Sequence, residues 1–236
     1  MSASAKPNLV GNSLVLAGAV LYLLEWVATV SANLSAPVGG GASAKDLLTA
    51  YTGNQQALGW AAGWFSVVLL GRVLIATGLR TALADSGRPQ PLMDVAVVAM
   101  AVGVALEIAT YAMVAGTSVL MAHGATGAQV RPVDAAAFAL DAMIWGPTGL
   151  ALVCCGIAMW RSALFPRALA GLGGAAGALL VVAAAGLQAP RFAGVASALQ
   201  AAVVLFWVWM LWTGVLLAVR ARAPRPVTMP VPEPAA

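Results

Sequence analysis

The chain is poor in charged side chains. Only 8% of its 236 residues are Asp, Glu, Lys or Arg, whereas 61% are hydrophobic and the mean hydropathy is +0.91. Soluble domains carry about 25% charged residues, so this chain has too few polar side chains to cover a surface that faces water. The composition excludes an ordinary soluble domain and indicates an integral membrane protein.

The residue types that usually bind metals or act as nucleophiles are also scarce. There is one histidine, His123, and there are two cysteines, the adjacent pair Cys154 and Cys155. Neighbours on a helix point to different faces, so we expect no disulfide, and no spacing resembles a zinc or CxxC motif. No Ser/His/Asp set lies in the apolar segments, and no glycine-rich stretch is followed by Lys-Ser/Thr. We therefore expect no metal and no cofactor.

Long apolar runs dominate what is present. A helix that crosses a bilayer needs ~20 mostly apolar residues. Six runs meet this need, at about 9–31, 58–79, 93–120, 134–160, 167–187 and 195–219. The pattern predicts one all-α domain over residues 1–220, a polytopic bundle of six transmembrane helices. Residues 221–236 contain five prolines, cannot continue a helix, and are predicted to form a disordered tail.

The distribution of positive charge predicts the orientation. The net charge is +4, but the basic residues are spread over the connections, which excludes a nucleic-acid surface. With the N-terminus inside, eight basic residues fall on the cytoplasmic side and three on the other side. This asymmetry follows the positive-inside rule. We expect a multi-pass protein of the cell membrane with both termini in the cytoplasm.

The longest connection, residues 32–57, lies on the outer side in this orientation. Its first half is rich in Gly, Ser and Ala. Its second half is predicted to form a short amphipathic helix, because Ser43 precedes Asp46 with the spacing of a capping box. The segment is either a lid over the bundle or a polar linker.

Three carboxylates lie well inside the predicted spans. Such groups are costly at membrane depth and usually face the bundle interior or a wet cavity. With a rise of ~1.5 Å per residue, Glu25 and Glu107 lie roughly 24 Å and 21 Å from the cytoplasmic helix ends. Asp141 lies roughly 20 Å from the same face of a ~30 Å core. The three side chains are therefore expected in one layer, lining a cavity, with Asp141 the strongest candidate for an acid.

Aromatic and amide side chains share helix faces with these carboxylates. Tyr22, Glu25 and Trp26 recur at i, i+3 and i+4, and Phe138 precedes Asp141 by three residues. Pro147 cannot donate to the carbonyl group four residues earlier, so a kink is expected beside Asp141. The side chains predicted to contact a substrate are Tyr22, Trp26, Trp60, Trp64, Tyr111, Phe138, Trp145, Gln200 and Trp207.

Other interpretations of single residues remain open. Trp and Tyr gather at membrane interfaces, which alone would account for Tyr51, Trp60, Trp160 and Trp212. Glu25 would be an interface residue if the first helix ended early. Asp134 is expected to be the N-cap of the fourth helix. Arg72 either reaches the cytoplasmic interface or forms a buried pair with Glu107 or Asp94.

The chemistry suited to such a layer is acid catalysis on an apolar substrate. Desolvation favours the protonated form of a carboxyl group, which can then act as a general acid, and aromatic faces stabilise cations. A six-helix chain with carboxylates in an aromatic outer-half pocket resembles the small bacterial integral-membrane terpene cyclases of the drimentine type. The resemblance implies an isomerase that cyclises a lipophilic isoprenoid arriving through the lipid bilayer.

The candidate catalytic residues, Asp141, Glu107 and Glu25, come from the depth argument and not from a family motif. The DxDD, DDxxD and NDxxD-like motifs of other cyclases and prenyltransferases are absent. We therefore expect a reaction that begins with a proton and needs no metal.

Two other classes compete with the enzyme. Intramembrane carboxylates also relay protons in transporters, although transporters often show symmetric halves with broken helices at the midplane, and the sequence shows a pocket on one side only. A non-catalytic membrane protein is the third class, and there Asp141→Asn would have no effect.

Overall fold

A computed structural model describes residues 9–34, 36–39, 41–84, 90–187, 189 and 191–222, and every regular element in these ranges is an α-helix. Residues 223–236, most of the predicted tail, lie outside the described part. The helices are α1 Leu9–Leu23, α2 Glu25–Ser31, α3 Ala44–Tyr51, α4 Gln55–Val68, α5 Leu70–Ala84, α6 Pro91–Ala122, α7 Gly127–Met143, α8 Trp145–Arg161, α9 Arg167–Leu187, α10 Ala193–Gln200 and α11 Ala202–Arg222.

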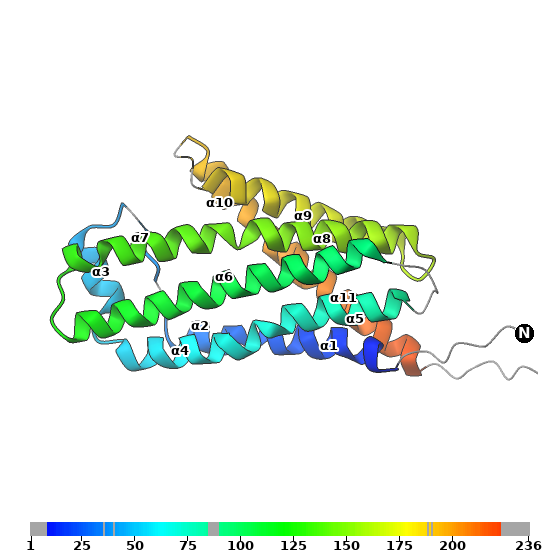
Figure 1. The fold of residues 1–236 in the computed structure, drawn as a ribbon, viewed down its shortest axis with the longest axis horizontal. Coiled ribbons are helices and arrows are strands. Elements are labelled where there is room, and N and C mark those ends of the chain that lie inside the picture. Colours follow the sequence, from blue (N-terminus) through cyan, green and yellow to red (C-terminus); the bar gives the residue numbers. More distant parts are fainter. Residues whose placement is uncertain are drawn as a thin grey trace, which may run out of the picture.

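In the described part of the chain, six helical segments are long and apolar enough to cross a membrane, which confirms the predicted all-α six-helix membrane bundle. They run Ser13–Ser31, Gln55–Ala84, Pro91–Ala122, Gly127–Arg161, Arg167–Leu187 and Ala193–Ala221. The bundle is elongated, and the start of α1 and the end of α11 lie at the same end, here called the terminal end (Figure 1). The opposite end, which carries α3, is called the loop end.

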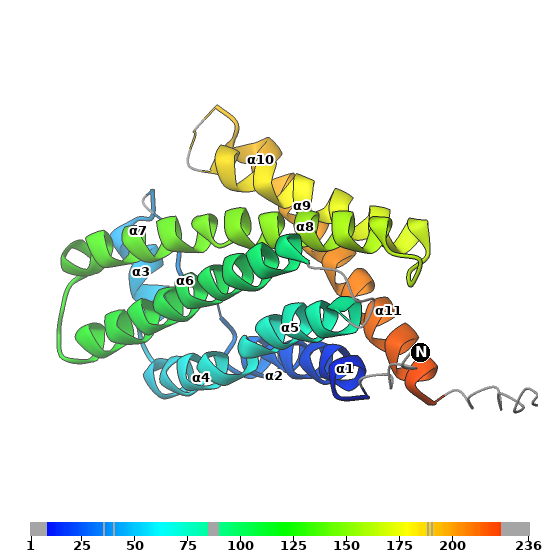
Figure 2. The same ribbon diagram turned by 45° about the vertical axis from the view of Figure 1, so that its right-hand side comes forward.

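Glycines allow the long helices to approach closely. α1 packs on α5 and α11, and α8 packs on α6 and α9. A Cβ atom added to Gly71 would lie 2.4 Å from the carbonyl oxygen of Gly18, and one added to Gly149 would lie 2.5 Å from that of Gly177. Small residues serve this purpose in membrane bundles, where backbones in contact gain van der Waals energy. Figure 2 shows α9 and α11 crossing the other helices of the bundle at an angle.

Four of the six spans are interrupted by one non-helical residue. The breaks are at Leu24 between α1 and α2, Leu69 between α4 and α5, Ile144 between α7 and α8, and Ala201 between α10 and α11. Pro147 explains the third break, as predicted, because it cannot donate to the carbonyl group of the previous turn. The spans formed by α6 and α9 are continuous.

The connection at the loop end folds back onto the bundle. α3 begins at its N-cap Ser43, which forms the predicted capping box with Asp46. Hydrogen bonds from Ser43 hold the pKa of the Asp46 carboxyl below its ordinary value. α3 packs on α6 and α7. Its buried residues join a second, smaller core formed by Leu47, Ala50, Tyr51, Leu58, Val114, Met121, Val130 and Ala137.

Candidate functional site

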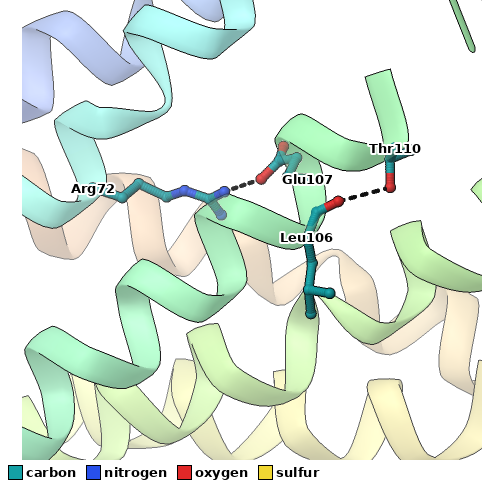
Figure 3. A network of polar contacts seen from close by, with 4 residues as sticks. All are labelled: Arg72, Leu106, Glu107 and Thr110. Carbon is teal, nitrogen blue, oxygen red and sulfur yellow. Dashed lines mark hydrogen bonds and ion pairs between the residues drawn. The ribbon is translucent and has the colours of Figure 1, made fainter. Parts of the chain in front are cut away.

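The centre of the bundle contains a buried ion pair between α5 and α6. Arg72 is fully buried, and its NH2 group contacts a carboxylate oxygen of Glu107 (Figure 3). The guanidinium carbon lies 5.1 Å from the ring centroid of Tyr22 on α1. Of the alternatives left open for Arg72, the buried pair with Glu107 is therefore confirmed. Asp94 instead pairs with Arg80 at 2.5 Å on the exposed surface.

The other two intramembrane carboxylates lie beside this pair. Glu25 is the first residue of α2, Asp141 lies in the last turn of α7, and both are half-buried. Each interacts electrostatically with Arg72. Tyr111 of α6 interacts with both carboxylates and with Arg72. Both acids therefore lie within electrostatic reach of the Arg72–Glu107 pair. We call Tyr22, Glu25, Arg72, Glu107, Tyr111 and Asp141 the polar layer.

Aromatic rings surround the polar layer. Tyr22 packs on Phe206 with centroids 5.7 Å apart, and Tyr111 stacks on Phe65 at 4.0 Å. Phe65 and Phe206 were not predicted, because a phenylalanine in an apolar helix carries no signal that separates a site residue from a core residue.

Trp26 and Trp207 form a further aromatic pair. Their rings are 5.2 Å apart and nearly perpendicular. Tyr22 also interacts with Trp207 and with Glu25 through its side chain. The two indoles, from α2 and α11, therefore border the polar layer on the side of Glu25.

The remaining predicted residues have other positions. Trp64 donates its indole N–H to the carbonyl oxygen of Leu24 at 2.7 Å, which satisfies a backbone group at the first helix break. Trp60 stacks on Trp64 at 5.9 Å and is 46% exposed, as expected of an interface residue. Trp145 and Gln200 are half-buried and directly adjoin the breaks at Ile144 and Ala201.

Asp134 does not cap a helix, which corrects the prediction. The N-cap of α7 is Thr126, which forms a capping box with Gln129, so the helix begins before Asp134. Asp134 is fully buried and accepts three hydrogen bonds: from the Tyr51 hydroxyl at 2.6 Å, and from the N–H groups of Gly39 at 2.8 Å and Val38 at 3.0 Å. We call this group the latch.

The latch fixes the 32–57 connection across the loop end, where it passes between α2 and α7 (Figure 1). Tyr51 is fully buried. Burial, and then its hydrogen bond to Asp134, raise the pKa of the Tyr51 hydroxyl. Gly39 has a φ of +104°, and a Cβ atom there would lie 3.3 Å from the ring of Phe138. Gly39 of the connection thus lies against one side of the Phe138 ring, which is otherwise 37% exposed, one turn before Asp141.

Two surface hollows lie outside the polar layer. An apolar groove of about 770 Å³ runs between α1 and α11, lined by Ser13, Leu16, Ala17, Val20, Leu21, Leu24, Ala218 and Ala221. Leu16, Val20 and Leu24 lie on a different face of the first span from Tyr22 and Glu25. A second hollow of about 550 Å³ at the loop end is lined by Ser31, Gly53, Asn54, Gln56, Ala57 and Trp60.

The carboxylates of the polar layer do not converge on one point. Among the described residues, no three His, Cys, Asp or Glu side chains form a group that could hold a metal ion. The arrangement instead places one arginine among three acids and several aromatic rings. Such a site can donate or accept protons and can stabilise positive charge.

Comparison of the chain with protein-family models, with curated proteins and with solved structures finds no match.

Proposed function

We propose that this chain is a cyclase of the cell membrane that protonates a linear isoprenoid and guides the resulting carbocation to a ring. One observation carries the proposal. Glu25 and Asp141 are half-buried carboxyl groups of the spans, and neither forms a salt bridge among the described residues, because Arg72 is paired with Glu107. Two acids of this kind, bordered by aromatic rings, are what proton-initiated cyclisation needs.

The geometry divides the roles of the three acids. Glu107 is held by Arg72, so we assign it to positioning the arginine and not to proton transfer. Asp141, which lies in the last turn of α7 beside the break at Ile144, is assigned as the acid. Glu25, across the layer on α2, is assigned as the base.

The reaction is then an isomerisation. The Asp141 proton adds to one alkene carbon, so that a C–H bond forms while the π bond breaks and leaves a tertiary cation. A second alkene attacks this cation and closes the ring with a new C–C bond. Loss of a proton from a neighbouring carbon to Glu25 forms the final double bond. Tyr22, Tyr111 and Trp207 present aromatic faces that stabilise the positive charge on the way.

The arrangement of the loop end fits a substrate that arrives through lipid. The latch holds residues 36–51 across that end, while the half toward the terminal end is filled by apolar side chains such as Ile75, Leu79 and Met93. A side entrance from the bilayer suits an isoprenoid, because such a molecule partitions into lipid.

The test is turnover in D₂O with the protein in lipid nanodiscs and a panel of linear isoprenoids. Wild type is expected to yield a cyclic isomer with one deuterium from solvent. Asp141→Asn and Glu25→Gln are each expected to lower the rate by about 10²-fold or more, the usual contribution of a general acid or base. Asp94→Asn, which removes an exposed carboxylate, is the matched control and should keep full activity. Full activity in Asp141→Asn would remove Asp141 from the acid role.

One observation favours proton-linked transport as a second candidate. Transporters place their sites at discontinuous helices near the bilayer midplane, and here four spans are broken next to or near polar side chains. Proteoliposomes that contain a pH-sensitive dye would test this function. A proton flux that requires a solute and is lost in Asp141→Asn, with no cyclic product, would favour transport over the cyclase.

A further inference from the structure

Arg72 has hydrogen-bonding capacity that the protein does not use. A guanidinium carries five N–H donors in a fixed plane. The NH2 group of Arg72 contacts Glu107, but its Nε and NH1 atoms have no hydrogen-bond partner among the described residues. The side chain is 0% exposed, so no bulk solvent reaches these donors. Buried donors without an acceptor are unfavourable, and an arginine is an expensive residue to leave in this state inside a membrane.

The neighbours of Arg72 do not supply the missing acceptors. The Tyr22 ring lies against the guanidinium at 5.1 Å and favours its charge, but a ring face does not accept the in-plane N–H groups. Glu25 and Asp141 interact with Arg72 electrostatically and form no hydrogen bond with it. The unused donors therefore belong to a buried side chain that lies within electrostatic reach of both proposed catalytic carboxyl groups.

We propose that Arg72 binds a neutral oxygen atom of the substrate, a hydroxyl, carbonyl or ether group at one end of the isoprenoid. This inference rests on the proposed function and specifies its substrate class. The oxygen would accept from Nε or NH1 while the apolar chain lies along the aromatic rings. Arg72 would thus orient the chain relative to Asp141.

The charges around Arg72 argue for a neutral oxygen and not for an ionic group. Glu107 already neutralises the guanidinium, and Glu25 and Asp141 lie within electrostatic reach of it. A carboxylate or diphosphate would add negative charge to a layer that contains three carboxyl groups and one arginine, which Glu107 already pairs. A cationic group on the substrate would be repelled by the positive charge of the arginine. A neutral acceptor satisfies the free donors without either repulsion.

The experiment compares two probes that differ in one atom. Farnesyl methyl ether offers an oxygen acceptor and no donor, and its carba-analogue has a CH₂ group in place of the oxygen. Binding is followed by quenching of tryptophan fluorescence in nanodiscs, since Trp26 and Trp207 border the layer, and is corrected for partitioning into empty nanodiscs. Wild type is expected to prefer the ether by about tenfold or more, as for a hydrogen bond to a charged group.

Two variants locate the preference. Arg72→Lys keeps the positive charge beside Glu107 but loses the planar set of donors, and the preference should fall to about twofold or less. Arg80→Lys changes the same residue type on the same helix, in the exposed pair with Asp94, and should leave the preference unchanged. If Arg72→Lys does not fold, the double variant Arg72→Gln/Glu107→Gln takes its place, because it replaces the ion pair by a neutral pair. It should also lose the preference for the ether.

Equal binding of the two probes by wild type would overturn the proposal. A preference for the ether that survives in Arg72→Lys would also overturn it, and so would an equal loss of this preference in Arg80→Lys. Because no turnover is needed, this result is separate from the test of catalysis. If Asp141→Asn prefers the ether but makes no product, both proposals stand. If wild type prefers the ether but makes no cyclic product from any isoprenoid, the cyclase fails and Arg72 remains a binding residue.

Discussion

The latch at Asp134 permits a prediction with a defined magnitude. Asp134→Asn keeps the size of the side chain but replaces one acceptor oxygen by an NH₂ group, which only donates. The three groups that face Asp134 are all donors, namely the Tyr51 hydroxyl and the N–H groups of Val38 and Gly39. In the variant at least one of these three donors faces the new NH₂ group. The others are left with a neutral amide oxygen in place of a charged carboxylate oxygen as their acceptor.

The size of the effect follows from the number and type of hydrogen bonds. A hydrogen bond to a charged group contributes about 1.5–3 kcal/mol, and a buried donor left unpaired costs about 1–3 kcal/mol. Asp134→Asn should therefore weaken docking of the connection by about 3–5 kcal/mol. Tyr51→Phe removes only one of the three bonds and should cost about 1.5–3 kcal/mol.

Hydrogen exchange read by mass spectrometry on the protein in nanodiscs measures this docking. Peptides that cover residues 36–51 should exchange at least about 100-fold faster in Asp134→Asn, because the lower end of this range, about 3 kcal/mol, corresponds to about that ratio. The change in Tyr51→Phe should be smaller. Asp94→Asn alters a carboxylate at the terminal end of α6, and it should leave these peptides unchanged.

Unchanged exchange of residues 36–51 in Asp134→Asn would refute the latch. Equal acceleration throughout α7 would also refute it, because Asp134 would then support the helix itself and not the connection.

Three further predictions concern the ion pair, a helix contact and pH. Glu107→Gln leaves Arg72 buried without its counter-ion, and should lower the free energy of unfolding in detergent by about 3–5 kcal/mol, with Arg80→Lys as an unaffected control. Gly71→Ala places a Cβ atom 2.4 Å from the carbonyl oxygen of Gly18, which forces α1 and α5 apart and should cost about 1–3 kcal/mol in the same unfolding measurement. Because the pKa of Tyr51 is raised in the folded state by burial, its contribution to docking is fully present below the ordinary tyrosine pKa of about 10 and is lost as the pH rises through the higher folded value. The tyrosinate absorbance of Tyr51 is the difference between the pH titrations of wild type and Tyr51→Phe. This difference should accordingly appear only above pH 10.

The prediction of one level for the carboxylates depends on two constants. The rise of a helix and the thickness of a bilayer fix the level of a residue once the span is located. This arithmetic predicts a common level for Glu25, Glu107 and Asp141. It could not show which of them pairs with Arg72, because the partner lies on another helix and depends on how α5 and α6 rotate and pack.

The error at Asp134 had a signal in the sequence that was overlooked. Thr126 and Gln129 have the T-x-x-Q spacing of a capping box, so the fourth span could have been started at Gly127. The helix continues through Pro132. A buried aspartate eight residues beyond the cap then needs donors from elsewhere, and the connection provides them. Its partners Val38 and Gly39 donate through the backbone, which no side-chain pattern reveals.

The helix breaks and the polar layer have one explanation, which the sequence only hints at. Glu25 directly follows the break at Leu24, Arg72 is the third residue after Leu69, and Asp141 is the third before Ile144. A change of direction at each break lets a half-helix turn its first or last residues toward the bundle interior. α6 is continuous over 32 residues, packs on α4, α5, α7 and α8, and carries Glu107 on its buried side.

Only the break at Ile144 has a proline within one helical turn, Pro147. The breaks at Leu24 and Leu69 have no proline nearby. At Leu24 the carbonyl group accepts hydrogen bonds both from the N–H of Val27 and from the indole of Trp64 on a neighbouring helix. A broken helix is tolerated at membrane depth only where other groups satisfy its backbone. Tertiary partners therefore fix the breaks, and the breaks decide which charges meet around Arg72. The continuous helix α6 holds Glu107 in place, and the broken spans bring the proposed acid, the proposed base and the arginine to it.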